Sequence, residues 1–342
     1  MRPRSRELVR LGAMEPGRFN AITDVDGVGV GHSTLIEGYS IRTGVTAIVP
    51  HQGNLIEDKV VAAVDLFNAY GKSTGLPQII YEGTLETPIM LTETMNTWRV
   101  ADAVVDYHRK KMGLEPRSLN VVVGETNGSY LTDNLGRQVG SEQVFEAIDM
   151  ARSPKGRGTV PEGNVGGGTP MTGYGFKGGI GTSSRLCEGF TVGSIVQLNC
   201  GSKEDLTIAG IPVGKEIKLY KKPAPSPGNC IMMILATDLN IESRQLWKVA
   251  KRAALGLART GTYGGNGSGD FTIAFTTGKR PHDGRGDEFL NPIYKAAVEA
   301  TEEAVVNALF AAETMTGYKG HVRHALPLDQ VEEILHKHGY IF

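Results

Sequence analysis

The stretch from Lys221 to Asp238, KKPAPSPGNCIMMILATD, constrains the fold more than any other part of the chain. Three prolines and a glycine stand before Asn229. They exclude regular structure there, because proline fixes φ and lacks an amide hydrogen. The apolar run 231–236 follows without a transition and predicts a buried strand. A loop therefore ends where a core strand begins, and Cys230 stands at the junction.

Two interpretations of Cys230 are open at this point. In the first, a surface loop enters a core strand whose first residue is a small hydrophobe. In the second, the junction is a self-cleavage site. The thiol of Cys230 attacks the carbonyl of Asn229, the peptide shifts to a thioester, and hydrolysis leaves Cys230 as a new N-terminus. The stretch alone favours the first interpretation, so the rest of the chain must decide.

The composition describes an ordinary globular protein with a small or neutral ligand. The 342 residues permit one or two domains, and 40% hydrophobic with 21% charged residues is enough to form a large core. The formal net charge is -1, which gives no electrostatic footprint for nucleic acid or an anionic membrane. We expect neither as a partner.

Cysteine usage and the N-terminus predict a reducing, cytoplasmic setting. The three cysteines are an odd set without CxxC spacing, which argues against a disulfide framework and a structural zinc site. The N-terminal residues carry charges throughout, and no later segment has about 18 uncharged apolar residues.

The histidines give no sign of a metal site. His321 and His324 are three positions apart but lack a nearby HExxH motif or set of carboxylates, so we expect no metal.

Periodicity predicts a mixed α/β fold with amphipathic outer helices. Strands are expected at 45–50, 119–123, 190–199, 231–236 and 271–275, and helices at 55–71, 97–112, 142–151, 243–260 and 292–316. The 45 glycines cluster beside these strands, chiefly in 163–181 and 261–269. Such clusters permit positive φ and can aim amide N–H groups at a ligand.

Polar side chains gather at the ends of these predicted strands. The sequence GETNGSYLTD follows one of them, and Asn199 ends another, where an amide can donate to a developing oxyanion. Ser268 and Asp270 lie in the glycine loop before the strand at 271–275. Each feature also has a local explanation in turn chemistry or backbone hydrogen bonding. The pattern alone leaves these alternatives open.

Together these stretches resemble the DmpA-type aminopeptidase family, which includes the β-peptidyl aminopeptidases. The matching pieces are ETPIMLTET at 86–94, GETNGSYLTD at 124–133, GNVGGGTPM and KGGIGTSSR within 163–185, VGSIVQLNCG at 192–201, GNCIMMILATD at 228–238 and GSGDFTIAFTT at 267–277. They keep the family's order and span nearly the whole chain, which makes the set far more specific than any one motif.

The resemblance implies a four-layer α-β-β-α sandwich, a fold shared with ornithine acetyltransferase. Residues 1–342 would form one structural domain that cleaves itself into 1–229 and 230–342. The family's habit is a tetramer of cleaved pairs, so we expect a homo-oligomer. No cofactor is implied.

The resemblance also implies catalytic roles. The nucleophile falls on Cys230, where the family usually has serine or sometimes threonine, and Asn199 becomes the oxyanion donor. Ser268 is paired with Asp270, where the family typically has glutamate. A freed N-terminal cysteine carries its own base, since an α-amine and a thiol have reference pKa values of about 7.7 to 8.0 and about 8.5.

Substrate-binding roles fall on the GETNGSYLTD segment. Glu125 would hold the substrate's ammonium, and Tyr130 would line the site. Asn127 stands where relatives often carry an aromatic residue, which predicts a more polar acyl pocket.

We therefore expect a self-processing aminopeptidase or amidase. It would release the first residue from small peptides, amides or esters through an acyl-enzyme on Cys230. Two alternatives are an acyltransferase of the ornithine acetyltransferase type and an unprocessed, non-catalytic relative.

Overall fold

The computed structural model describes residues 2–219, 223–224, 229–278 and 286–340. Two sheets form its centre. One has the strand order β1-β2-β5-β6, and the other has the order β4-β3-β12-β11-β10-β9. The strands are β1 (Gly29–Glu37), β2 (Ile41–Val49), β5 (Ile89–Glu93), β6 (Val122–Thr126), β4 (Thr84–Leu85), β3 (Val60–Ala69), β12 (Gly269–Thr276), β11 (Cys230–Thr237), β10 (Phe190–Asn199) and β9 (Gly179–Cys187).

The described chain also contains seven α-helices and two short hairpins, besides short 3-10 turns. The helices are α1 (Leu76–Glu82), α2 (Thr97–Lys110), α3 (Ser141–Arg152), α4 (Val213–Glu216), α5 (Ser243–Ala258), α6 (Asn291–Ala311) and α7 (Leu328–Lys337). The hairpins pair β7 (Thr172–Gly173) with β8 (Phe176–Lys177), and β13 (Met315–Thr316) with β14 (Val322–Arg323).

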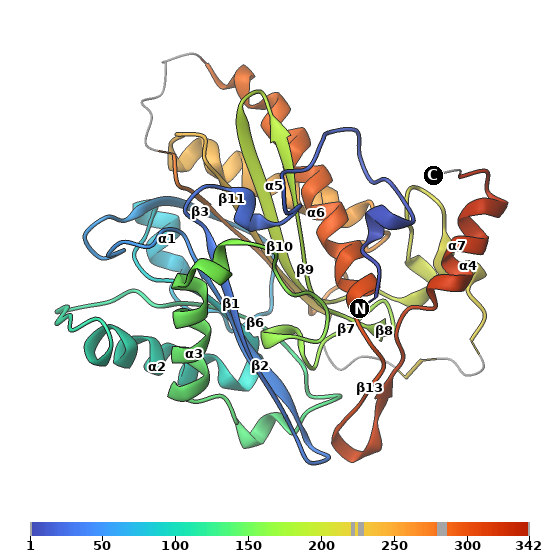
Figure 1. The fold of residues 1–342 in the computed structure, drawn as a ribbon, viewed down its shortest axis with the longest axis horizontal. Coiled ribbons are helices and arrows are strands. Elements are labelled where there is room, and N and C mark those ends of the chain that lie inside the picture. Colours follow the sequence, from blue (N-terminus) through green and yellow to red (C-terminus); the bar gives the residue numbers. More distant parts are fainter. Residues whose placement is uncertain (1, 220–222, 225–228, 279–285, 341–342) are drawn as a thin grey trace.

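The layers follow from three apolar clusters. Ile48 and Leu91 of the four-stranded sheet share a core with Ile195, Ile234 and Ile273 of the six-stranded sheet, so the two sheets pack face to face. α2 and α3 cover the outer face of the first sheet. α5 and α6 cover the outer face of the second (Figure 1). The expected α-β-β-α sandwich is confirmed.

The strand that starts with Cys230 is central, as expected. β11 lies between β10, which runs antiparallel to it, and β12, which runs parallel. All eight of its residues are buried. Buried apolar side chains therefore flank the junction on both faces of the sheet.

Two expectations about secondary structure were wrong. The segment 55–71 contains the strand β3 instead of a helix, and β3 pairs with β12. Residues 60–64 are apolar on both faces of the sheet, since Ala62 packs in the core between the sheets and Ala63 in the core under α5 and α6, so no period of two marks the strand. The last long helix ends at Ala311, well before Gly317, and β13 follows.

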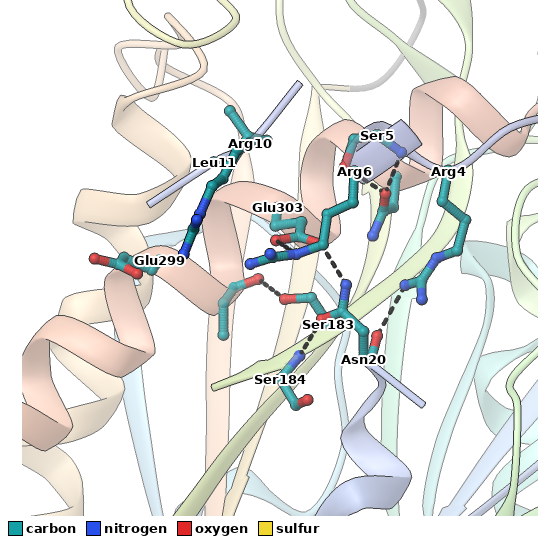
Figure 2. A network of polar contacts seen from close by, with 12 residues as sticks. Arg4, Ser5, Arg6, Arg10, Leu11, Asn20, Ser183, Ser184, Glu299 and Glu303 are labelled. Atoms are coloured by element: carbon teal, nitrogen blue, oxygen red, sulfur yellow. Dashed lines mark hydrogen bonds and ion pairs between the residues drawn. The ribbon is translucent and has the colours of Figure 1, made fainter. Parts of the chain in front are cut away.

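A buried ionic network fastens the N-terminal segment to α6 and β9 (Figure 2). Arg185 of β9 donates to Glu303 at 2.7 Å and to Glu299 at 3.3 Å, and Arg6 donates to Glu303 at 3.0 Å. Breaking such a buried pair is strongly destabilising, because it leaves an uncompensated charge away from water. The TSSR motif that follows the glycine-rich run therefore has a structural role here.

Within the described ranges, no helix is both long enough and apolar enough to cross a membrane.

Candidate active site

Cys230 and Asn199 face each other across the two central strands. They are directly paired in the register of β11 and β10, which places their side chains on the same face of the sheet. The backbone N–H of Gly269, which begins the neighbouring strand β12, donates to Cys230 Sγ at 3.4 Å. Three strands thus bring a thiol, an amide side chain and a backbone donor to one point.

The surroundings of Cys230 oppose ionisation of its thiol. Burial raises its pKa, and the negative charges of Glu125 and Asp270 raise it further. The hydrogen bond from Gly269 acts in the opposite direction. Since the net shift is upward, the thiol is protonated at neutral pH and needs a base before it can attack.

The amide of Asn199 is held at both ends. Its Nδ2 donates to the carbonyl of Asn127 at 2.9 Å, and its Oδ1 accepts from the N–H of Thr172 at 2.8 Å. A side-chain amide nitrogen carries two hydrogens, so this geometry uses one and leaves the other for a further acceptor. Such fixed donors are the kind that stabilise an oxyanion.

Ser268 and Asp270 form a hydrogen-bonded pair beside the thiol. Ser268 Oγ donates to Asp270 Oδ1 at 2.6 Å, and both side chains are about 1% exposed. Asn68 of β3 donates through Nδ2 to Asp270 Oδ2 at 3.1 Å and to the carbonyl of Gly264 at 3.1 Å. Burial raises the pKa of Asp270, and the hydrogen bonds from Ser268 and Asn68 lower it.

A β-bulge places Asn68 opposite Asp270. The register of β12 with β3 pairs Asp270 with Asn68 and then shifts, so that Phe271 pairs with Leu66. Bulges of this kind re-aim side chains and are common next to active sites. Here the bulge brings an amide to a carboxylate that is one methylene shorter than glutamate.

Glu125 is the buried carboxylate at the end of β6. Its Oε1 accepts from the N–H of Lys72 at 2.7 Å, and its Oε2 accepts from the hydroxyl of Thr94. It is 2% exposed and lies close enough to raise the pKa of Cys230. A carboxylate held in this way can bind an ammonium group near the thiol.

The other two predicted residues are placed differently. The side chain of Asn127 accepts from the N–H of Ser129 at 3.0 Å, and it is the main-chain carbonyl of Asn127 that holds Asn199. Tyr130 lies in a neighbouring cavity, where its ring stacks on His321 with the centroids 4.4 Å apart. The structure therefore joins Cys230, Asn199, Ser268, Asp270 and Glu125 and sets Tyr130 apart.

Sequence reasoning missed several residues that hold the site together. Asn68 was hidden because its segment was interpreted as a helix. Thr94 and Thr172 lie in or beside the quoted motifs but were given no role. Lys177, at the end of β8, is fully buried and donates to the carbonyls of Gly168 at 3.1 Å and Gly178 at 2.7 Å, and burial lowers its pKa well below the usual value.

Comparisons with known proteins agree with this architecture. The model of peptidase family S58 matches residues 20–323. β-Peptidyl aminopeptidase BapA of Sphingosinicella xenopeptidilytica is 39% identical, over 97% of this chain and 91% of its own.

Two solved structures show the same fold. A protein from Pyrococcus horikoshii OT3 is 44% identical, with a TM-score of 0.90, and the match covers 99% of this chain and 100% of that one. The L-aminopeptidase D-Ala-esterase/amidase of Ochrobactrum anthropi, described as a variant of the Ntn hydrolase fold, is 38% identical with a TM-score of 0.88 and the same coverage. We conclude that the chain belongs to peptidase family S58 and is a hydrolase of amide bonds with the Ntn hydrolase fold.

Proposed function

We propose that this protein is a self-processing aminopeptidase whose nucleophile is Cys230. The observation that carries the proposal is the position of that thiol. It is the first residue of a central strand, opposite Asn199 and in contact with the N–H of Gly269. In this function the enzyme releases the first residue of small peptides, amides or esters.

Self-cleavage would begin at the bond between Asn229 and Cys230. Sγ attacks the Asn229 carbonyl carbon, a C–S bond forms, and the C–N bond to Cys230 breaks as its nitrogen takes a proton. Water then hydrolyses the thioester, which leaves a carboxylate on Asn229 and a free amine on Cys230. Asn229 Oδ1 accepts from the N–H of Gly201 at 2.8 Å, which supports the proposal by fixing the residue before the bond.

The base differs before and after cleavage. The nitrogen of Cys230 is a peptide nitrogen in the precursor, so the Ser268–Asp270 pair is our choice for removing the thiol proton. After cleavage the free α-amine of Cys230 can take that proton itself.

Turnover would repeat the same chemistry on a substrate. The thiolate attacks the substrate carbonyl, and the free N–H of Asn199 receives the oxyanion. The amine of the leaving group departs with a proton, and water hydrolyses the thioester on Cys230. Glu125 would hold the substrate's ammonium, which limits cleavage to the first residue.

N-terminal sequencing and intact-mass measurement of the purified protein test the proposal. We expect two chains divided between Asn229 and Cys230. A stable full-length species that still hydrolyses amides would contradict the mechanism. A single 36.7 kDa chain without activity would instead favour the non-catalytic alternative.

Incubation with an acyl donor and an amino-acid acceptor tests the acyltransferase alternative, which predicts more acyl transfer than hydrolysis.

The rate of self-cleavage is expected to rise with pH. Burial, Glu125 and Asp270 raise the pKa of Cys230 above its ordinary value, so at neutral pH the reactive thiolate is a small fraction that grows about tenfold per pH unit. Precursor from cell-free synthesis at pH 6 can be shifted to pH values up to 9 and followed on denaturing gels. A rate that is flat or falls between pH 6 and 8 would contradict this prediction.

Replacing Asn68 by alanine is expected to slow self-cleavage and change its pH profile. The lost hydrogen bond to a charged group is worth about 1.5–3 kcal/mol, roughly 10- to 150-fold. Because the bond lowers the pKa of Asp270, its loss raises that pKa and moves the acidic limb of the pH profile of the self-cleavage rate to higher pH. Leu66→Ala on the same strand is the control. An unshifted profile in Asn68→Ala would show a purely structural role.

Assembly into a tetramer of cleaved pairs stays a prediction. Light scattering of the purified protein would test it, and a monomeric cleaved pair would contradict it.

A further inference from the structure

A cavity of about 760 Å³ lies next to the residues described above. Leu219, Pro223 and Ala224 line one part of it, and Tyr130, Phe176 and the segment 320–324 line the rest. The volume falls in the range of about 300–1,000 Å³ that is typical of sites for small molecules. The catalytic chemistry leaves this cavity without a role.

The ionisable side chains that line the cavity favour an anion. Among the described lining residues they are Tyr130, His321, Arg323 and His324, and no aspartate or glutamate is among them. The guanidinium of Arg323 lies over the ring of Tyr130, with its carbon 3.8 Å from the centroid. Arg323 is about 1% exposed, so its charge acts where the dielectric constant is low and electrostatic attraction is strong.

His321 is oriented by Tyr130 as well. The Nδ1 of its ring lies 2.8 Å from the carbonyl of Tyr130, so Nδ1 carries a proton, and the two rings stack at an interplanar angle of 11°. Nε2, the other ring nitrogen, is then an acceptor in the neutral ring and a donor in the charged ring. His324 is exposed and lies at the same cavity.

Hydrogen bonds connect the cavity to the oxyanion donor. Arg323 Nε donates to Thr172 Oγ1 at 3.2 Å, and the N–H of Thr172 donates to Asn199 Oδ1 at 2.8 Å. Asn199 is paired with Cys230. Glu125 accepts hydrogen bonds from the hydroxyl of Thr94 and the N–H of Lys72, and neither of these residues lines the cavity. Glu125 and Arg323 are therefore linked to the surroundings of the thiol through different contacts.

We propose that this cavity binds the C-terminal carboxylate of a short peptide while Glu125 holds its N-terminal ammonium. The inference rests on the proposed function and narrows its substrate class to dipeptides and tripeptides with a free C-terminus. A buried arginine with flanking histidines attracts a carboxylate, while the neutral amide of the same peptide loses that attraction. The apolar walls at Phe176 and Leu219 accept the carbon skeleton of the residue that leaves.

Paired substrates test the proposal. The cleaved enzyme is assayed with L-Ala-L-Ala and β-Ala-L-Ala and with the C-terminal amides of both. We expect kcat/KM to be about tenfold or more higher for the acid than for its amide, mainly through KM. Equal values for acid and amide would overturn the inference and leave the proposed function standing. Absence of turnover with every substrate would instead count against the proposed function.

A matched pair of variants at the exposed His324 assigns the effect to the cavity. His324→Glu adds a negative charge at its lining and is expected to lower the acid-to-amide ratio of kcat/KM about tenfold, while His324→Gln lowers it less than threefold. Arg323→Gln is expected to remove the preference, and Arg323→Lys to restore part of it. An unchanged ratio in His324→Glu, or in a folded Arg323→Gln, would place the selectivity elsewhere and overturn the inference.

Discussion

The variant Cys230→Ala is expected to stay a single 36.7 kDa chain and to lose hydrolytic activity by about 10⁴-fold or more. Alanine keeps the small apolar volume at the start of β11 but removes the atom that would form both proposed thioesters. In the proposed mechanism, cleavage and turnover use the same sulfur, so one substitution is expected to abolish both. Denaturing gels, intact mass and an amide hydrolysis assay measure the two losses.

Two further variants control this experiment. Cys187→Ala removes a buried thiol that contacts the core beneath α5 and α6, and it is expected to be cleaved and active. Cys230→Ser introduces serine, the residue that the DmpA-type family usually carries at the matching position. This variant is expected to retain part of both activities. Turnover by Cys230→Ala above the background of a mock purification would refute the assigned nucleophile.

The variant Glu125→Gln is expected to lose most of its activity on substrates with a free N-terminal amine. Removing one member of a buried charged pair costs about 2–4 kcal/mol, roughly 30- to 1,000-fold in kcat/KM. If Glu125 holds the substrate's ammonium, wild-type enzyme should also refuse N-acetylated substrates. The measurement is kcat/KM for each amine substrate and its acetylated form, in wild type and variant.

Glu93 supplies a matched control for Glu125. It is a fully buried glutamate at the end of the neighbouring strand, and burial raises its pKa to about 8. It is therefore protonated at pH 7, and Glu93→Gln closely mimics that neutral form. We expect the control to lose far less activity than Glu125→Gln. Equal turnover of acetylated and free substrates by wild type would exclude the role of Glu125.

The sequence alone was sufficient to predict the strands that position the candidate site. Apolar runs ending at Asn199 and starting after Cys230 correspond to β10 and β11, and the glycine loop before 271–275 delivers Ser268 and Asp270. These signals are local, since each polar residue directly adjoins the strand that positions it. Burial in a central strand leaves a continuous apolar run that is visible without knowledge of its neighbours.

The contacts between distant segments were not predictable in this way. Asn68 and Asp270 are 202 positions apart, and only the pairing of β3 with β12 brings them together. Both faces of β3 pack against apolar cores, so its residues do not show the alternation that identifies a half-buried strand. Tyr130 shares a motif with Glu125, but its position depends on a stack with His321, 191 positions away.

The strand order has a consequence for the cleaved protein. β11 and β12, which follow the Asn229–Cys230 bond, lie between β3 and β10, which precede it. After cleavage, neither fragment keeps an intact six-stranded sheet, so the fragments cannot part without exposing four strand edges and the core between them. If the proposed cleavage occurs, the precursor folds as one molecule, whereas the two unfolded fragments must first meet by diffusion. Recovery of the proposed cleaved enzyme after denaturation should therefore depend on protein concentration. Its persistence in the folded state would then rest mainly on slow unfolding, because the separated fragments refold less readily than one chain.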